Sequence, residues 1–234
     1  MVLLVVAMDQ GNEGSGERGW HPEGKYIPPR RNHGKHGNHG NHGKHGKHGK
    51  HGSREYPPQM TMVLEELQLL ERKFAAEKKY DDAFSMAQAR WTILKNTRGK
   101  RHAETLKVMS SLGWVCSKRV HVFQLSACSR EHLQHAVDIL DECRVLHEDV
   151  YGKDNPETLE VVYRLGTVLQ FFDPLRARDV METCLELRKA AAEPDELKIS
   201  LAEHRLAVIL SKFGELNKAK GLLEHAWDVR KRLE

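Results

Sequence analysis

Residues 33–52 form a low-complexity tract in which histidine recurs at every third position and glycine follows each histidine. The tract holds seven imidazoles: His33, His36, His39, His42, His45, His48 and His51. Because imidazole nitrogens bind Zn²⁺, Cu²⁺ and Ni²⁺, a flexible chain of them can wrap one such ion. Metal binding is therefore the chemistry that the tract offers. The plainer interpretation is a simple repeat that is tolerated outside the folded part, so we expect no dedicated cofactor.

The tract belongs to an N-terminal tail, residues 1–58, whose composition differs from that of the remaining chain. The tract has no apolar side chain, so nothing offsets the entropy cost of ordering its backbone, and we expect a disordered tail. Residues 1–54 hold nine Lys and Arg but four Asp and Glu, while the whole chain has a net charge of +4. The remaining chain is therefore close to neutral, which argues against a nucleic-acid partner.

The first eight residues are an apolar run that is too short to span a bilayer and lacks a leading basic segment. We therefore expect neither a signal peptide nor a membrane partner, and Met8 is an alternative start. The four cysteines form no C-x-x-C pair, which favours buried thiols in a reducing compartment, and we expect a cytoplasmic protein.

The chain contains no motif of the common catalytic sites: no nucleophile elbow, phosphate-binding loop, zinc-protease helix or dinucleotide fingerprint. Adjacent carboxylates such as Glu65–Glu66 and Asp81–Asp82 lie in amphipathic stretches and indicate a solvated surface. We therefore expect no enzymatic activity.

Internal repeats are present in the part that follows the tail. Residues 164–172 and 205–213 are similar at a spacing of 41, and residues 103–106 match 156–159 at a spacing of 53. An insertion of about eleven residues, which we place around residues 119–130, accounts for the longer spacing. The sequence therefore predicts a repeat domain, residues 59–234, with units at about 60–99, 100–152, 153–193 and 194–234.

Each unit has apolar residues at helical spacing on both sides of a short turn. The predicted first helices are 61–77, 103–118, 156–171 and 195–212, and the second helices are 80–96, 131–150, 174–191 and 216–233. Small residues mark the places where paired helices must approach: Gly113, Gly166, Ala207, Ala83, Ala136, Ala177 and Ala219. The predicted fold class is all-α. We also expect Trp91, Trp114 and Trp227 to pack in the core or between repeats.

Two motifs resemble a known repeat. Residues 152–159 read Gly-Lys-Asp-Asn-Pro-Glu-Thr-Leu at a helix entry, and residues 214–219 read Gly-Glu-Leu-Asn-Lys-Ala at a turn. Both resemble the tetratricopeptide repeat, in the longer variant found in kinesin light chains. The resemblance implies a solenoid of about four antiparallel helical hairpins. It also implies a non-enzymatic scaffold that binds a partner peptide or helix in a concave groove lined by the first helices.

In that family, two polar residues before a Leu-Ala pair on each first helix line the groove. The matching residues here are Ser110, Ser111, Tyr163, Arg164, His204 and Arg205. The two arginines could bond acidic or phosphorylated groups on a partner, and Tyr163 could supply a flat contact. A solvated face that binds nothing is the plainer interpretation.

Some features depart from the family pattern. The third turn, residues 172–175, has no glycine, and the helix at 216–233 lacks a polar helix packed over it. Self-association through that helix is one consequence, and a fragment of a larger tetratricopeptide-containing signalling receptor is another. Metal binding or metal sensing by the histidine tract remains an alternative function.

Overall fold

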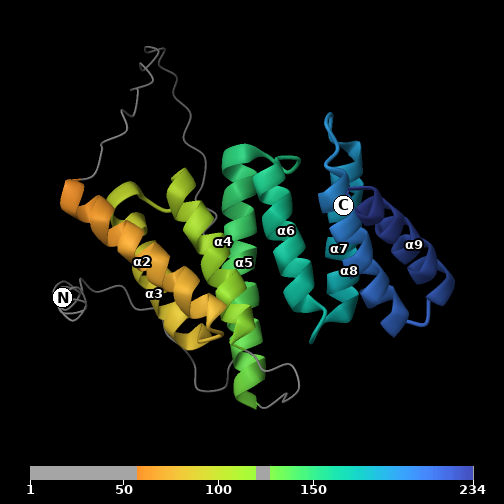
Figure 1. Cartoon of the computed structure of the whole chain (residues 1–234), viewed down its shortest axis with the longest axis horizontal. Coiled ribbons are helices and arrows are strands. Elements are labelled where there is room, and N and C mark those ends of the chain that lie inside the picture. The colour runs from red at the N-terminus through yellow and green to blue at the C-terminus, as the bar shows by residue number, and fades with distance from the viewer. Residues whose placement is uncertain (1–56, 120–126, 234) are drawn as a thin grey trace, which may run out of the picture. The chain divides into compact units, whose positions relative to one another are not determined.

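The computed structural model describes residues 57–119 and 127–233. Within these residues it contains eight α-helices and no strand (Figure 1). The helices are α2 (Pro58–Ala76), α3 (Tyr80–Arg98), α4 (Ala103–Lys118), α5 (Ala127–Tyr151), α6 (Pro156–Leu169), α7 (Pro174–Ala190), α8 (Glu196–Lys212) and α9 (Leu216–Leu233). The all-α prediction is confirmed. The predicted disordered tail and its histidine tract lie outside the described residues.

Each helix packs mainly on the helices before and after it in the chain. The pairs α2–α3, α4–α5, α6–α7 and α8–α9 are helical hairpins, and α3–α4, α5–α6 and α7–α8 join each hairpin to the next. The first helices of neighbouring hairpins also meet, where α4 approaches α6. This order of contacts is that of a solenoid, as the sequence predicted.

Capping residues explain where several helices begin. The side chain of Asn155 accepts a hydrogen bond from the amide of Glu157 at 2.9 Å, and Pro156 occupies the first helical position of α6. Asp195 accepts from the amide of Lys198 at 3.0 Å at the start of α8. Gly214 has φ 77°, a left-handed conformation that favours glycine, and it ends the preceding helix.

The insertion differs in one respect from its prediction. We expected the second helix of that unit to begin at residue 131, but α5 begins at Ala127. Residues 127–130 contain neither glycine nor proline, so nothing in them prevents one more helical turn.

Small residues allow the paired helices to approach closely. A Cβ atom added to Gly113 would lie 2.7 Å from Cγ of Leu140 and 3.2 Å from Cγ2 of Ile139. A Cβ atom added to Gly166 would lie 2.7 Å from Cε of Met181, which is the end of a flexible side chain. The two glycines therefore face neighbours that differ in how easily they can move.

We expect Gly113→Ala to be more destabilising than Gly166→Ala. Overpacking against the branched Leu140 costs about 1–3 kcal/mol, and alanine returns about 1 kcal/mol through its helix propensity. For Gly166→Ala the methionine can adapt, so the two effects should nearly cancel. Urea unfolding of both variants measures the difference, and equal loss of stability in the two would contradict this prediction.

The tryptophan predictions have mixed outcomes. Trp91 is half-buried and packs against the core, in agreement with the prediction. Trp114 is half-buried, and cationic side chains lie beside its ring. The prediction for Trp227 is wrong, because this side chain is 69 % exposed on α9.

Among the described residues, no helix combines the length and the apolar character that crossing a membrane requires.

Candidate functional site

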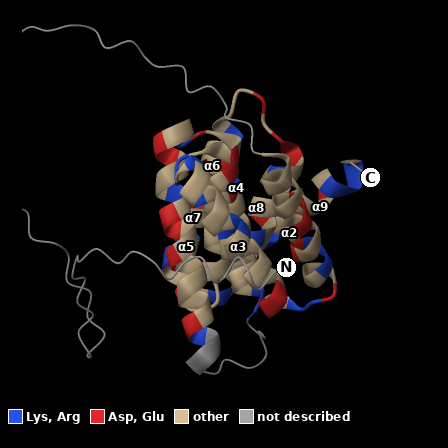
Figure 2. Cartoon of the chain, turned by 90° about the vertical axis from the view of Figure 1, so that its left-hand side faces the viewer, with Lys and Arg blue, Asp and Glu red and all other residues tan. Residues whose placement is uncertain are grey.

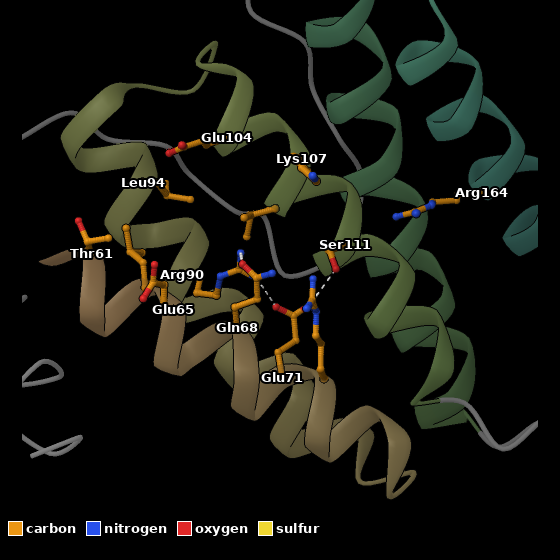
Figure 3. A pocket seen from close by; sticks show the side chains of 13 residues that line it. Thr61, Glu65, Gln68, Glu71, Arg90, Leu94, Glu104, Lys107, Ser111 and Arg164 are labelled. Carbon is orange, nitrogen blue, oxygen red and sulfur yellow. Dashed lines mark hydrogen bonds and ion pairs between the residues drawn. The ribbon is translucent and has the colours of Figure 1, made fainter. Parts of the chain in front are cut away.

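A hollow of about 490 Å³ lies between α2 and α4, with α3 behind it and α6 at one side (Figure 3). The residues that matter for its chemistry are Gln68, Glu71, Arg90, Lys107, Ser111 and Arg164. The two predicted groove residues among them are Ser111 and Arg164. The hollow is therefore formed mainly by first helices, as the resemblance implied for a groove.

The floor of the hollow is a buried polar network. Nη1 of Arg90 lies 2.5 Å from Oε2 of Glu71, and Nη2 donates to Oε1 of Gln68 at 2.9 Å. The hydroxyl of Ser111 donates to Oε1 of Glu71 at 2.7 Å. The side chains of Glu71 and Arg90 are 7 % and 13 % exposed. Ser111 therefore already has a partner inside the protein.

The rim of the hollow carries charges that are free to meet a ligand. Lys107 and Arg72 are exposed and, among the described residues, have no carboxylate within 4.0 Å. Glu65 on the same rim is also exposed. Figure 2 shows this end of the array, where acidic and basic residues are interspersed along the helices. The rim therefore offers both signs of charge.

Arg164 takes part in a network that joins three helices. Its Nε donates to Oε1 of Glu160 at 3.1 Å, and its Nη1 donates to the hydroxyl of Ser110 at 3.2 Å. Oε2 of Glu160 also lies 3.4 Å from Arg188, whose guanidinium is 4.9 Å from the ring centre of Tyr163. The predicted groove residues Ser110, Tyr163 and Arg164 are thus brought together, but Arg164 already has a carboxylate partner.

Arg205 is the arginine with the greater capacity to bind an anion. It is half-buried, and no ion pair to it is found within the described part of the chain, whereas Arg164 is paired with Glu160. Burial lowers the pKa of Lys118, and the positive charge of Arg205 lowers it further. Nζ of Lys118 lies 4.3 Å from the ring centre of Trp114. We refer to Trp114, Lys118 and Arg205 as the cationic cluster.

His204, the neighbour of Arg205, belongs to the same end of the array. Burial lowers the pKa of His204, and the charges of Arg230 and Arg205 lower it further. His204 is therefore uncharged at neutral pH, and it can donate or accept one hydrogen bond without adding charge.

The sequence prediction missed Trp114 and Lys118 as site residues. Both follow Ser111 on α4, by three and seven positions, so all three lie on one side of the helix. That spacing was available from the sequence. What it did not show was that a tryptophan, usually a core residue, would stand half-exposed between the side chains of Lys118 and Arg164.

Three free cysteines in the described part of the chain are buried. Burial raises the pKa of Cys143 to about 12 and that of Cys116 and Cys184 to about 11, so these thiols are protonated at neutral pH. In residues 57–119 and 127–233, no group of three His, Cys, Asp or Glu side chains is arranged to hold a metal ion.

Comparisons with known proteins agree with this architecture. The tetratricopeptide repeat family model matches residues 204–234. Comparison with curated proteins found no matching sequence. BtubC (BKLC) from P. vanneervenii has a similar structure, with a TM-score of 0.63 and 16 % identity over 77 % of this chain and 67 % of that one.

Two further solved structures contain the nearly identical TPR-like repeats of a Podosopora anserina protein assigned as a kinesin light chain. One has a TM-score of 0.56 and 17 % identity over 79 % of this chain and 81 % of that one. The other, a single-substitution variant of the same protein, has a TM-score of 0.57 and 16 % identity over 73 % and 76 %. At these identities the similarity concerns the fold.

The fold defines the class of protein: a helical-repeat solenoid of the tetratricopeptide type. More narrowly, the array is similar to kinesin-light-chain-like repeats, as the two sequence motifs predicted. Repeat arrays of this type generally serve as scaffolds for protein–protein interaction.

Proposed function

We propose that this chain is a non-enzymatic adaptor that binds a segment of a partner protein along the face formed by its first helices. The observation that carries the proposal is the hollow between α2 and α4, which is continuous through Arg164 with the next first helix. A ligand lying across α4, α6 and α8 would meet the cationic cluster after leaving the hollow. The predicted residues Ser110, Ser111, Tyr163, Arg164, His204 and Arg205 belong to this proposed path.

The partner segment that fits this path carries carboxylate or phosphate groups. Neither Arg205 nor Lys118 has a carboxylate partner among the described residues, so both gain from an anion. Trp114 beside them offers an aromatic surface for an apolar side chain of the same segment. We place this interaction in the cytoplasm, in keeping with the three buried thiols.

Charge reversal in the cationic cluster tests the proposal. Lys118→Glu/Arg205→Glu is expected to weaken capture of a partner from native lysate by about tenfold or more, because each reversal replaces attraction by repulsion. The measurement is quantitative affinity capture, with labelled acidic and phosphorylated peptides titrated by anisotropy against neutral peptides of equal length.

The matched control is Lys78→Glu/Lys153→Glu, which makes the same change in net charge at two exposed residues outside the cluster. This control and a deletion of residues 33–52 should leave capture unchanged. Equal losses in the control and the cluster variant would show that only net charge matters. Capture that depends on residues 33–52 and on added metal would assign the function to the histidine tract instead.

A further inference from the structure

The outer side of the last hairpin is more exposed than the equivalent positions of the other hairpins. The second helices can be aligned on a buried alanine that each of them contains near its start: Ala83, Ala136, Ala177 and Ala219. Four positions later stand Ala87, Leu140 and Met181, each 0 % exposed. The equivalent residue of α9 is Leu223, which is 40 % exposed.

Two more positions of this register show the same difference. Eleven positions after the alanine stand Leu94, His147 and Arg188, which are 3 %, 3 % and 5 % exposed, whereas Arg230 of α9 is half-buried. Eight positions after the alanine, Trp91 and Arg144 are half-buried and Leu185 of α7 is 7 % exposed, whereas Trp227 of α9 is 69 % exposed. A following first helix packs on α3, α5 and α7, but no described helix follows α9.

Arg188 of α7 and Arg230 of α9 are equivalent, and their hydrogen bonds show which contact α9 lacks. Arg188 donates to the carbonyl of Leu159 in its own hairpin at 3.5 Å and to the carbonyl of Lys198 in the next first helix at 2.6 Å. Arg230 donates to the carbonyl of Ser200 at 3.4 Å, which is the equivalent bond within its own hairpin. The second bond has no counterpart at Arg230 among the described residues.

Opposite charges also meet at two of the junctions between hairpins. Lys189 of α7 pairs with Glu203 of α8 at 2.7 Å, and Arg98 of α3 pairs with Glu104 of α4 at 3.1 Å. Lys231, the equivalent of Lys189, is exposed on α9. A helix that packs on α9 as α8 packs on α7 would therefore carry a carboxylate that pairs with Lys231.

A second copy of this chain does not supply such a helix through α2. A three-residue turn follows both α2 and α8, so the two helices can be aligned from their C-terminal ends. In this alignment Glu66 and Lys73 of α2 take the positions of Ala202 and Ile209 of α8. The α8 residues are both 0 % exposed, so an α2 helix placed on α9 would bury two charged side chains. Two α9 helices packed in parallel would bring together their basic ends, Arg230–Arg232.

We propose that the outer face of α8–α9, formed by Leu223, Trp227 and Arg230, binds an amphipathic helix of a protein partner. The internal junctions share a small or β-branched residue at i, i+3 and i+10, as in Ile199, Ala202 and Ile209 of α8. The α7–α8 junction adds a carboxylate at i+4, Glu203, which pairs with Lys189. This site is separate from the face formed by the first helices, and it extends the stacking already present in the chain.

The probe is a labelled peptide with the sequence of residues 195–213, which contains α8 and its cap. It should bind the full chain with saturable anisotropy. Leu223→Asp/Trp227→Asp should weaken that binding by about tenfold or more, because the apolar contact surface is lost. The matched control is Leu175→Asp, which alters an exposed leucine of α7 and should bind the peptide like the unmodified chain.

A second peptide with Ala202→Glu and Ile209→Lys reproduces the polar pattern of α2 and should not bind. Failure of the first peptide to bind, or equal binding of both peptides, would overturn the proposal. Sedimentation velocity of the chain alone should show a monomer. A dimer that Trp227→Asp dissociates would assign the face to a second copy instead. Lys118→Glu/Arg205→Glu should leave peptide binding unchanged, which separates this site from the proposed groove.

Discussion

Arg90→Met is expected to destabilise the folded chain by about 3–5 kcal/mol, the usual cost of leaving one member of a buried ion pair without its partner. Arg90 pairs with Glu71 at 2.5 Å and also bonds Gln68. After the substitution Glu71, whose side chain is 7 % exposed in the unmodified chain, keeps only the hydroxyl of Ser111 as a partner. Solvation of the carboxylate would then require α2 to move away from α3.

The measurement is urea unfolding followed by circular dichroism, together with hydrogen exchange of α2. Glu71→Gln in the Arg90→Met background should recover most of the lost stability, because a neutral amide has no charge to solvate. If the double variant is as unstable as Arg90→Met alone, packing of the arginine side chain, and not the unpaired charge, is the main cause. Partner binding should fall in parallel, since this network is the floor of the hollow.

The second large effect is expected where three helices share one carboxylate. Glu203 of α8 is 2 % exposed, with Lys189 of α7 at 2.7 Å and His225 of α9 at 2.6 Å. Lys189→Met/His225→Leu removes both partners and leaves a buried carboxylate alone, which should cost about 3–5 kcal/mol. Because Lys189 and His225 are themselves 49 % and 58 % exposed, Glu203→Leu should cost much less than removing both partners.

A thermodynamic cycle tests whether removing both partners of Glu203 costs more stability than removing Glu203 itself. The triple variant Lys189→Met/Glu203→Leu/His225→Leu should regain most of the stability lost in the double variant. A broadened or two-step urea transition is also expected in the double variant, because the contact couples the third hairpin to the fourth. A small loss in the double variant would contradict the prediction and indicate that water reaches the carboxylate of Glu203.

The helices of this chain could be predicted because their signals are local. Asn155–Pro156, the glycines of the turns and the alanines of the second helices each act within a few residues of their own position. The groove residues were harder to interpret. Ser110, Tyr163 and Arg164 do meet in one network, but Arg164 already has Glu160 and Ser110 as partners, and we therefore propose Arg205 as the anion-binding residue.

The sequence by itself determined that this chain forms antiparallel helical hairpins in a shared register, since helix periodicity and close-approach residues repeat along it. Tertiary structure alone decided which charges are buried and paired and which remain available. Glu71 and Arg90 are 19 residues apart in the sequence, and Ser110 and Arg164 are 54 apart. The first pair is set by how two helices pack within a hairpin, and the second by how hairpins stack. The same stacking left Trp227 exposed on α9, although its register position is covered in the hairpin before it.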